Sequence, residues 1–205
     1  MLMVALALLM ANDTIHIRTV DQEPAILNAA DLEALGPPSI GPASGVSVWL
    51  LGDSGSVYLI LRVLDSTPAW NDRLVLTVDT NGDRSGTPQH DDFEWDFHRV
   101  ADSSVVYRGR NGRWQAPRDD PDWRLGRDRE GGGWAVREKE ILQGWLLIVK
   151  LDAEYFRPST GVAPGLGIAR YDESSRAWTT WPMVPSLRQP GALPDHPVLW
   201  GSVLR

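Results

Sequence analysis

Residues 74–98, LVLTVDTNGDRSGTPQHDDFEWDFH, contain the pattern that decides the fold. Side chains in residues 74–79 and again in residues 92–98 alternate between two faces with a period of two, which is typical of β-strands. The second run directs three aromatic side chains to one face: Phe93, Trp95 and Phe97. These two runs predict a pair of strands that place one face on a hydrophobic core and are joined by a polar, glycine-bearing loop.

The rest of the chain repeats this pattern. Residues 57–64 and 145–151 are apolar on both faces, which predicts strands at the centre of a sheet. Glycine- and proline-rich turns separate the short apolar runs, and residues 25–35 offer no more than one or two helical turns. The sequence therefore predicts an all-β fold, an antiparallel β-sandwich of jelly-roll type with roughly nine to eleven strands.

The length of 205 residues suits one large β domain, which we place at residues 13–205. Residues 1–12 are almost entirely apolar, and their run is too short to span a bilayer. It has the length of a signal-peptide core but lacks a basic start, so a buried first strand or a packed helix is the alternative. A signal peptide predicts an extracytoplasmic protein.

Composition excludes several classes of function. The net charge of −7 disfavours a nucleic-acid partner, because phosphates would be repelled. The absence of cysteine excludes disulfides, zinc–thiolate sites and cysteine nucleophiles. Ten tryptophans are an unusually large number, and flat aromatic rings are suited to stacking on the C–H faces of sugars.

The loop between the two strands predicts a calcium site. Ca²⁺ takes six to eight oxygen ligands, and closely spaced acidic residues on a glycine-bearing loop can supply several of them. Arg84 and His90 stand where an EF-hand needs glycine and glutamate, so the loop is not an EF-hand. The alternative is a turn in which Asp and Asn side chains bond to their own backbone. The candidate ligands are Asp79, Asn81, Asp83, Asp91 and Asp92.

The second strand carries a polar stripe opposite its aromatic face, made of Asp92, Glu94, Asp96 and His98. Adjacent carboxylates repel one another unless cations or arginines lie between them. The stripe therefore predicts a solvated sheet face with salt bridges. The alternatives are a face whose carboxylates bind sugar hydroxyls and a glycosidase-like carboxylate pair.

Tryptophans in loops are harder to explain as core residues than those in strands, such as Trp49, Trp95 and Trp145. The alternative is that they close the ends of the sandwich. The predicted sugar-binding residues combine these tryptophans with two polar neighbours: Trp70, Asn71, Asp72, Trp114, Trp123 and Trp178.

The order of these pieces resembles the family 9 carbohydrate-binding modules and the wider group of DOMON-like β-sandwich domains. The segments that carry the resemblance lie within residues 20–182: VYLILRVLD, TPAWNDRLVLTVDTNGDR, DDFEWDF, WLLIVKL, GLGIARYD and RAWTTWP. The resemblance implies a jelly-roll-like sandwich that often carries structural calcium and in some members binds sugars. Relatives in the DOMON-like group bind haem instead.

Together these features predict a non-catalytic carbohydrate-binding module with structural calcium, which belongs to a surface or secreted assembly with other domains. A b-type haem-binding electron-transfer domain is the first alternative, with axial ligands available among His16, His98, His196, Met183 and Lys150. A cell-surface structural module without a small ligand is the second alternative.

Overall fold

The computed structural model describes residues 14–26, 29–41, 45–65, 67–99, 103–115, 130–131, 133–157, 161–183 and 190–204. The apolar segment 1–12 and Trp123 lie outside the described residues. Within the described residues, no helix is long and apolar enough to cross a membrane.

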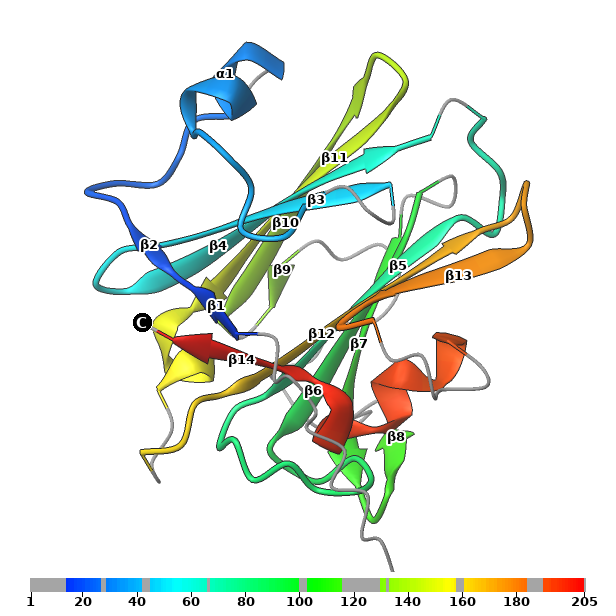
Figure 1. Cartoon of the computed structure of the whole chain (residues 1–205). Coiled ribbons are helices and arrows are strands. Elements are labelled where there is room, and N and C mark those ends of the chain that lie inside the picture. Colours follow the sequence, from blue (N-terminus) through cyan, green and yellow to red (C-terminus); the bar gives the residue numbers. More distant parts are fainter. Residues whose placement is uncertain are drawn as a thin grey trace, which may run out of the picture.

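Two β-sheets face each other (Figure 1). Among the described residues, the first sheet has eight strands: β1 (Thr14–His16), β5 (Arg73–Asp79), β6 (Asp92–His98), β7 (Ser103–Arg110), β8 (Arg113–Gln115), β12 (Gly165–Asp172), β13 (Ala177–Trp181) and β14 (Gly201–Leu204). The second has six: β2 (Arg18–Thr19), β3 (Val46–Gly52), β4 (Ser56–Leu64), β9 (Glu130–Gly131), β10 (Trp134–Ile141) and β11 (Gly144–Asp152). The predicted all-β sandwich is confirmed.

The strand orders are β1-β14-β12-β5-β6-β7-β8, with β13 also paired to β12, and β2-β3-β4-β11-β10-β9. All the longer strands pair antiparallel, as predicted. Two short pairs, β1 with β14 and β2 with β3, are parallel, so both sheets are mixed. The predicted first strand is divided into β1 and β2, because the chain passes from one sheet to the other at Ile17.

The core lies between the sheets and is built by the alternation that the sequence displays. On β6, Trp95 and Phe97 are fully buried in this core. On β4, Leu59 and Leu61 enter the same core, whereas Ile60 points to the opposite face and is also fully buried. The predicted central position of β4 is therefore confirmed, because both of its faces are covered.

Helical segments cover the outer faces of the sheets (Figure 1). The short helix α1 (Ala29–Ala34) packs Leu32 on Trp49 and Tyr58 outside the second sheet. The C-terminal 3₁₀ turns η2 (Pro190–Asp195) and η3 (Pro197–Leu199) lie on the first sheet and contact β12. A third 3₁₀ turn, η1 (Ala153–Phe156), follows β11.

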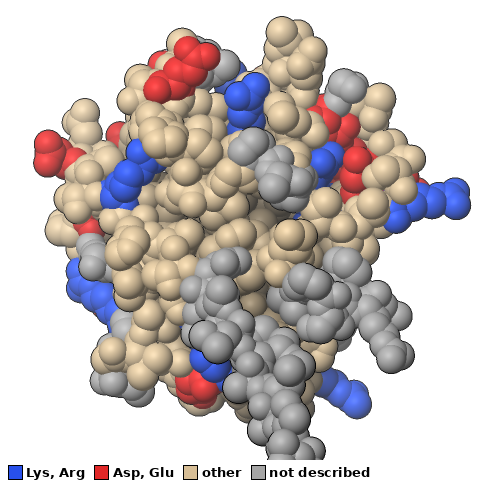
Figure 2. All heavy atoms as spheres, viewed as in Figure 1, with Lys and Arg blue, Asp and Glu red and all other residues tan. Residues whose placement is uncertain are grey.

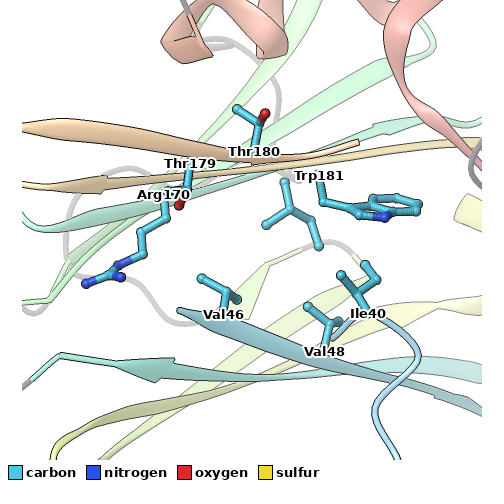
Figure 3. A pocket seen from close by; sticks show the side chains of 8 residues that line it. Ile40, Val46, Val48, Arg170, Thr179, Thr180 and Trp181 are labelled. Carbon is cyan, nitrogen blue, oxygen red and sulfur yellow. The ribbon is translucent and has the colours of Figure 1, made fainter. Parts of the chain in front are cut away.

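A crevice opens between the sheets where β3 faces β12 and β13 (Figure 3). Ile40, Val46 and Val48 lie on one side and Trp181 on the other. Its volume of about 10 Å³ leaves room for no more than a water molecule. The crevice is therefore a packing defect and not a ligand site.

Candidate functional site

The sandwich has two ends, and strands β5 and β6 run antiparallel between them. We call the end with residues 65, 67–72, 142–143 and 173–176 the tryptophan end, because Trp70 lies there. We call the opposite end, with loop 80–91, the carboxylate end. Cross-sheet contacts close the tryptophan end: Arg99 of the first sheet bonds to Asp65 and Glu140 of the second.

Trp70 is the most exposed aromatic side chain in the described part of the chain, with 68% of its surface accessible. Its loop is nevertheless held firmly by Asp72, which is buried. One carboxylate oxygen of Asp72 accepts a hydrogen bond from the backbone N–H of Ala69 at 2.6 Å, and the other accepts from Glu173 at 3.0 Å. Asp72 therefore ties the Trp70 loop to the β12–β13 turn.

The hairpin on the far side of this tie carries Trp178. Its ring contacts Tyr171 with 5.2 Å between ring centroids, and the Arg73 guanidinium lies 4.8 Å from its centre. Arg73 in turn forms an ion pair of 3.1 Å with Asp96. Arg73 and Tyr171 were not predicted as site residues, because the pairing of β12 with β5 joins segments almost 100 residues apart and leaves no local signal.

We expect Asp72→Ala to weaken any binding at the tryptophan end by about three- to tenfold, because the loss of loop order should cost binding about as much as one hydrogen bond, roughly 0.7–1.4 kcal/mol. Hydrogen exchange at Ala69 and Glu173 should accelerate in the same variant. An unchanged exchange rate at both amides would show that the tie does not hold the loop.

The other predicted sugar-binding residues are distributed as follows. Asn71 lies beside Trp70 and is exposed. Trp114 lies at the carboxylate end, where its ring stacks on Trp200 with 6.3 Å between centroids and 6° between planes. The structure therefore brings the Trp70 loop and the Trp178 hairpin together and separates Trp114 from them.

Three of the five predicted calcium ligands gather at the carboxylate end. Asp79 and Asp92 are directly opposite each other in the β5–β6 pair, and Asp91 precedes Asp92. One oxygen from each carboxylate lies within 4.8 Å of the others. The register of β5 with β6 thus brings Asp79 close to Asp91, which lies 12 positions further along the sequence.

Several carboxylate oxygens of this cluster are buried without a hydrogen-bond partner in the described residues. Asp79 accepts hydrogen bonds from the backbone N–H groups of Gly82 and Arg84, at 2.6 and 3.0 Å. In the described part of the chain, Oδ1 of Asp92 and both oxygens of Asp91 are buried without a hydrogen-bond partner. Oδ1 of Asp91 lies 3.5 Å from Nδ1 of the exposed His90. A buried oxygen without a hydrogen-bond donor destabilises the folded state unless a cation binds it.

The electrostatics of the cluster agree with this geometry. Burial, together with the negative charges of Asp79 and Asp91, raises the pKa of Asp92 to about 8. Burial also raises the pKa of Asp79. A hard divalent cation would reverse both effects, because it favours the ionised carboxylates.

Asn81 and Asp83 are used differently. Oδ1 of Asn81 accepts from the Asp83 N–H at 2.7 Å, and Oδ1 of Asp83 accepts from Ser85 at 2.9 Å. These are the self-bonding turns that the sequence offered as the alternative to calcium binding. Gly82 is required between them, since its φ is +73° and a Cβ would lie 2.5 Å from the Ala163 carbonyl oxygen.

Loop 80–91 also holds the C-terminal strand. The Arg84 guanidinium donates to the carbonyl oxygens of Trp200 and Gly201 and to the hydroxyl of Ser202. In the sequence, Arg84 was informative only as a departure from an EF-hand, and its partner lies more than 110 residues away.

The polar stripe on β6 is not the solvated face that the alternation predicted. Asp92 is fully buried and Asp96 is 6% exposed. Burial, together with the nearby charges of Asp96 and Asp195, raises the pKa of Glu94 to about 8. Segment η2 covers part of this sheet, which a local alternation could not reveal. The expected salt bridges do form, since Asp96 pairs with Arg73 and His98.

No protein-family model and no curated protein sequence matches the chain. Solved structures do match it. One is a carbohydrate-binding module of family 9 from Caldicellulosiruptor kristjanssonii in complex with glucose, with a TM-score of 0.59 and 16% identity over 94% of this chain and 95% of that one. The chain has the fold of a family 9 carbohydrate-binding module.

A second family 9 structure from the same organism, in complex with cellotriose, has a TM-score of 0.57 and 18% identity, with coverage of 94% and 93%. The predicted likeness to the family 9 fold is therefore confirmed over nearly the whole chain. At this level of identity the likeness concerns the fold, so the binding residues must be argued from the chain itself.

Proposed function

We propose that this chain is a non-catalytic carbohydrate-binding module that binds sugar at the tryptophan end and carries structural calcium at the carboxylate end. The observation that carries the proposal is the exposure of Trp70 on a loop held in place by Asp72. A large aromatic ring exposed on a rigid support is suited to bind a ligand, because little flexibility is lost on binding.

The neighbourhood of Trp70 supports a sugar as the ligand. Trp178 and Tyr171 supply further aromatic surface, while Arg73, Asn71 and Asp96 supply polar groups. Aromatic faces beside a few polar groups are typical of sites for neutral polar ligands. The complexes of the two family 9 neighbours with glucose and cellotriose point to the same ligand class.

The proposed calcium ligands are Asp79, Asp91 and Asp92, with the remaining oxygens supplied by water. An all-oxygen donor set fits a hard cation such as Ca²⁺ rather than zinc. The cation would neutralise three converging carboxylates and hold the two ends of loop 80–91 together.

The raised pKa of Asp92 predicts a pH dependence for the metal-free protein. Between the ordinary value of 3.8 and about 8, the folded protein holds a proton that the unfolded chain releases. The free energy of unfolding should therefore fall as pH rises through this range. In the presence of a chelator, we expect Asp92→Asn to melt at a higher temperature than the wild type at pH 8 and to show a smaller fall from pH 5 to pH 8.

The pKa of Glu94 is also raised. The Asp92→Asn variant should therefore still lose part of its stability between pH 5 and pH 8. Thermal unfolding followed by circular dichroism measures both profiles. If Asp92→Asn melted at a lower temperature than the wild type at pH 8 without metal, the ionised Asp92 carboxylate would not destabilise the metal-free fold.

Titration with glucose and cellotriose, followed by tryptophan fluorescence, tests the proposed sugar binding. A spectral shift that saturates is the expected result. A Soret band in the purified protein would instead favour the haem alternative, and an absence of any ligand response would favour a structural module. A polysaccharide ligand would place the protein outside the cytoplasm, in agreement with the localisation that we propose.

A further inference from the structure

The hairpin formed by β7 and β8 presents three arginines on one face. Arg110 and Arg113 are directly opposite each other in the strand register, and Arg108 lies two positions before Arg110. Side chains two positions apart on a strand share a face of the sheet, and so do side chains directly opposite each other. We call the face with Arg108, Arg110 and Arg113 the arginine face. It belongs to the carboxylate end, at the lower edge of the molecule in Figure 1.

These arginines have no acidic partner among the described residues. Arg108 donates to the carbonyl oxygen of His90, and its guanidinium lies 5.3 Å from the centre of the Phe93 ring. Arg110 and Arg113 are exposed, and neither guanidinium has a hydrogen-bond or ion-pair partner in the described part of the chain. Like charges directly opposite each other destabilise a sheet. An anion bound between the two guanidinium groups would remove this repulsion.

A shortage of acidic residues does not explain the unpaired arginines. The chain has 27 acidic residues and a net charge of −7. Figure 2 shows a basic side chain at the lower right edge, in the region of this hairpin, with no acidic side chain beside it on the visible face. Basic and acidic side chains adjoin each other at the upper right of the same view. The arginine face is therefore a local excess of positive charge on an acidic protein.

The hairpin that carries these arginines is held rigidly. Asn111 and Gly112 have φ values of 52° and 76°, and positive values at both central residues are those of a type I′ turn. The Gly112 N–H donates to the carbonyl oxygen of Pro88 at 3.0 Å. The backbone at Gly109 packs so closely on loop 80–91 that a Cβ would lie 2.1 Å from the Gln89 carbonyl oxygen. The backbone therefore fixes the positions from which the arginines extend.

The chemistry of the face indicates a ligand with more than one anionic group. The planar guanidinium fork matches a carboxylate, a sulfate or a phosphate. Opposite side chains of a strand pair start about 5 Å apart, so Arg110 and Arg113 can each bind one anionic group of a polymer. Gln115 lies opposite Arg108 and is exposed, so its amide is available to hydroxyl groups next to the anions.

A protein partner fits this face poorly. Specific protein interfaces are built around large apolar or aromatic anchors and bury about 800 Å² on each partner. The exposed large hydrophobic residues of the described chain all lie outside this hairpin: Leu64, Trp70, Leu142, Val162, Met183 and Leu204.

A nucleic acid also fits this face poorly. Duplex DNA carries about one negative charge every 1.7 Å, which the acidic remainder of the protein would repel. The carboxylates of Asp79, Asp91 and Asp92 lie at the same end. A polymer of uronic acids carries one carboxylate on each sugar unit, so its charge is spread more thinly and its hydroxyls can use Gln115.

We propose that the arginine face binds an acidic polysaccharide through the carboxylates of its uronic acid units. This inference goes beyond the proposed binding of a neutral sugar at Trp70, and it does not depend on it. The two surfaces lie at opposite ends of the sandwich and take ligands of different charge.

Binding to immobilised polygalacturonate, measured by interferometry in calcium-free buffer, tests the proposal. Wild type should bind this polymer but not its fully methyl-esterified form, which keeps the sugar units and lacks the charges. Binding should weaken about tenfold between about 50 and 200 mM salt, because three released counterions correspond to roughly this factor. Arg110→Gln and Arg113→Gln should each weaken binding about fivefold, and the double variant at least about tenfold.

Arg176→Gln is the matched control, because Arg176 is exposed in a turn at the tryptophan end and its replacement removes the same charge. It should bind polygalacturonate as the wild type does. In the absence of ligand, Arg110→Gln should melt slightly higher than the wild type at low salt, since the repulsion from Arg113 is lost. This readout also shows that the variant folds.

The proposal is wrong if the double variant keeps the affinity of the wild type, if both forms of the polymer bind equally, or if the wild type binds neither. Equal binding of polyglutamate or single-stranded DNA would overturn it as well, because the face would then respond to charge alone. Glucose titration of the double variant should match the wild type. A wild type that binds polygalacturonate but not glucose would contradict the function proposed for Trp70 and leave the arginine face in place.

Discussion

Trp70→Ala is expected to weaken glucose binding about 30-fold while leaving the melting temperature almost unchanged. A buried aromatic anchor in an interface contributes about 2 kcal/mol or more to binding, which corresponds to this factor. In the free protein, Trp70 is 68% exposed and contributes little to the core, so its loss should alter stability by less than about 0.5 kcal/mol. Calorimetry and thermal unfolding measure the two quantities.

Trp70→Phe and Trp114→Phe are the matched controls. Trp70→Phe keeps a smaller ring and should retain part of the affinity. Trp114 stacks on Trp200 at the carboxylate end, so Trp114→Phe should change the melting temperature without changing glucose affinity. Equal affinity of wild type and Trp70→Ala would remove Trp70 from the proposed site.

Calcium is expected to raise the melting temperature by roughly 10 °C over the chelated protein. A ligand at a thousand times its dissociation constant stabilises the folded state by about 4 kcal/mol. In a domain of this size, each kcal/mol corresponds to about 2–4 °C. Differential scanning calorimetry with excess CaCl₂ and with excess chelator measures the difference.

Two variants of the same loop separate a specific site from a general effect of salt. Asp92→Asn removes a charge from the three-carboxylate cluster and should abolish most of the calcium response. Asp83→Asn keeps the oxygen that accepts from Ser85 and lies outside the cluster, so its response should match the wild type. A melting temperature that does not change on chelation of the wild type would contradict the calcium proposal.

The architecture was largely predictable because the alternation of side chains follows from the geometry of a single strand. Trp95 and Phe97 had to share a face in any sheet, and the apolar residues on both faces of β4 required cover on both sides. What lay over the outer faces was not predictable. Segment η2 contacts β12, β13 and β5 from a position about 20 residues beyond β12 in the chain, and its Asp195 helps to raise the pKa of Glu94 in the polar stripe.

The candidate sites divide in the same way. The acidic loop indicated oxygen ligands, but only the register of β5 with β6 selected Asp79, Asp91 and Asp92 and left Asn81 and Asp83 to form turns. No sequence pattern distinguished one loop tryptophan from another as a binding residue. The tie from Asp72 to Glu173 brought two of their segments together, and the stack on Trp200 placed Trp114 elsewhere.

By itself, the sequence determined the strands, the faces that enter the core and the types of chemistry available in the loops, because these depend on neighbours along the chain. The tertiary structure decided which of these groups meet. Register, sheet order and the path of the C-terminal segment depend on contacts between residues as far apart as Arg84 and Trp200, and no local pattern records such contacts.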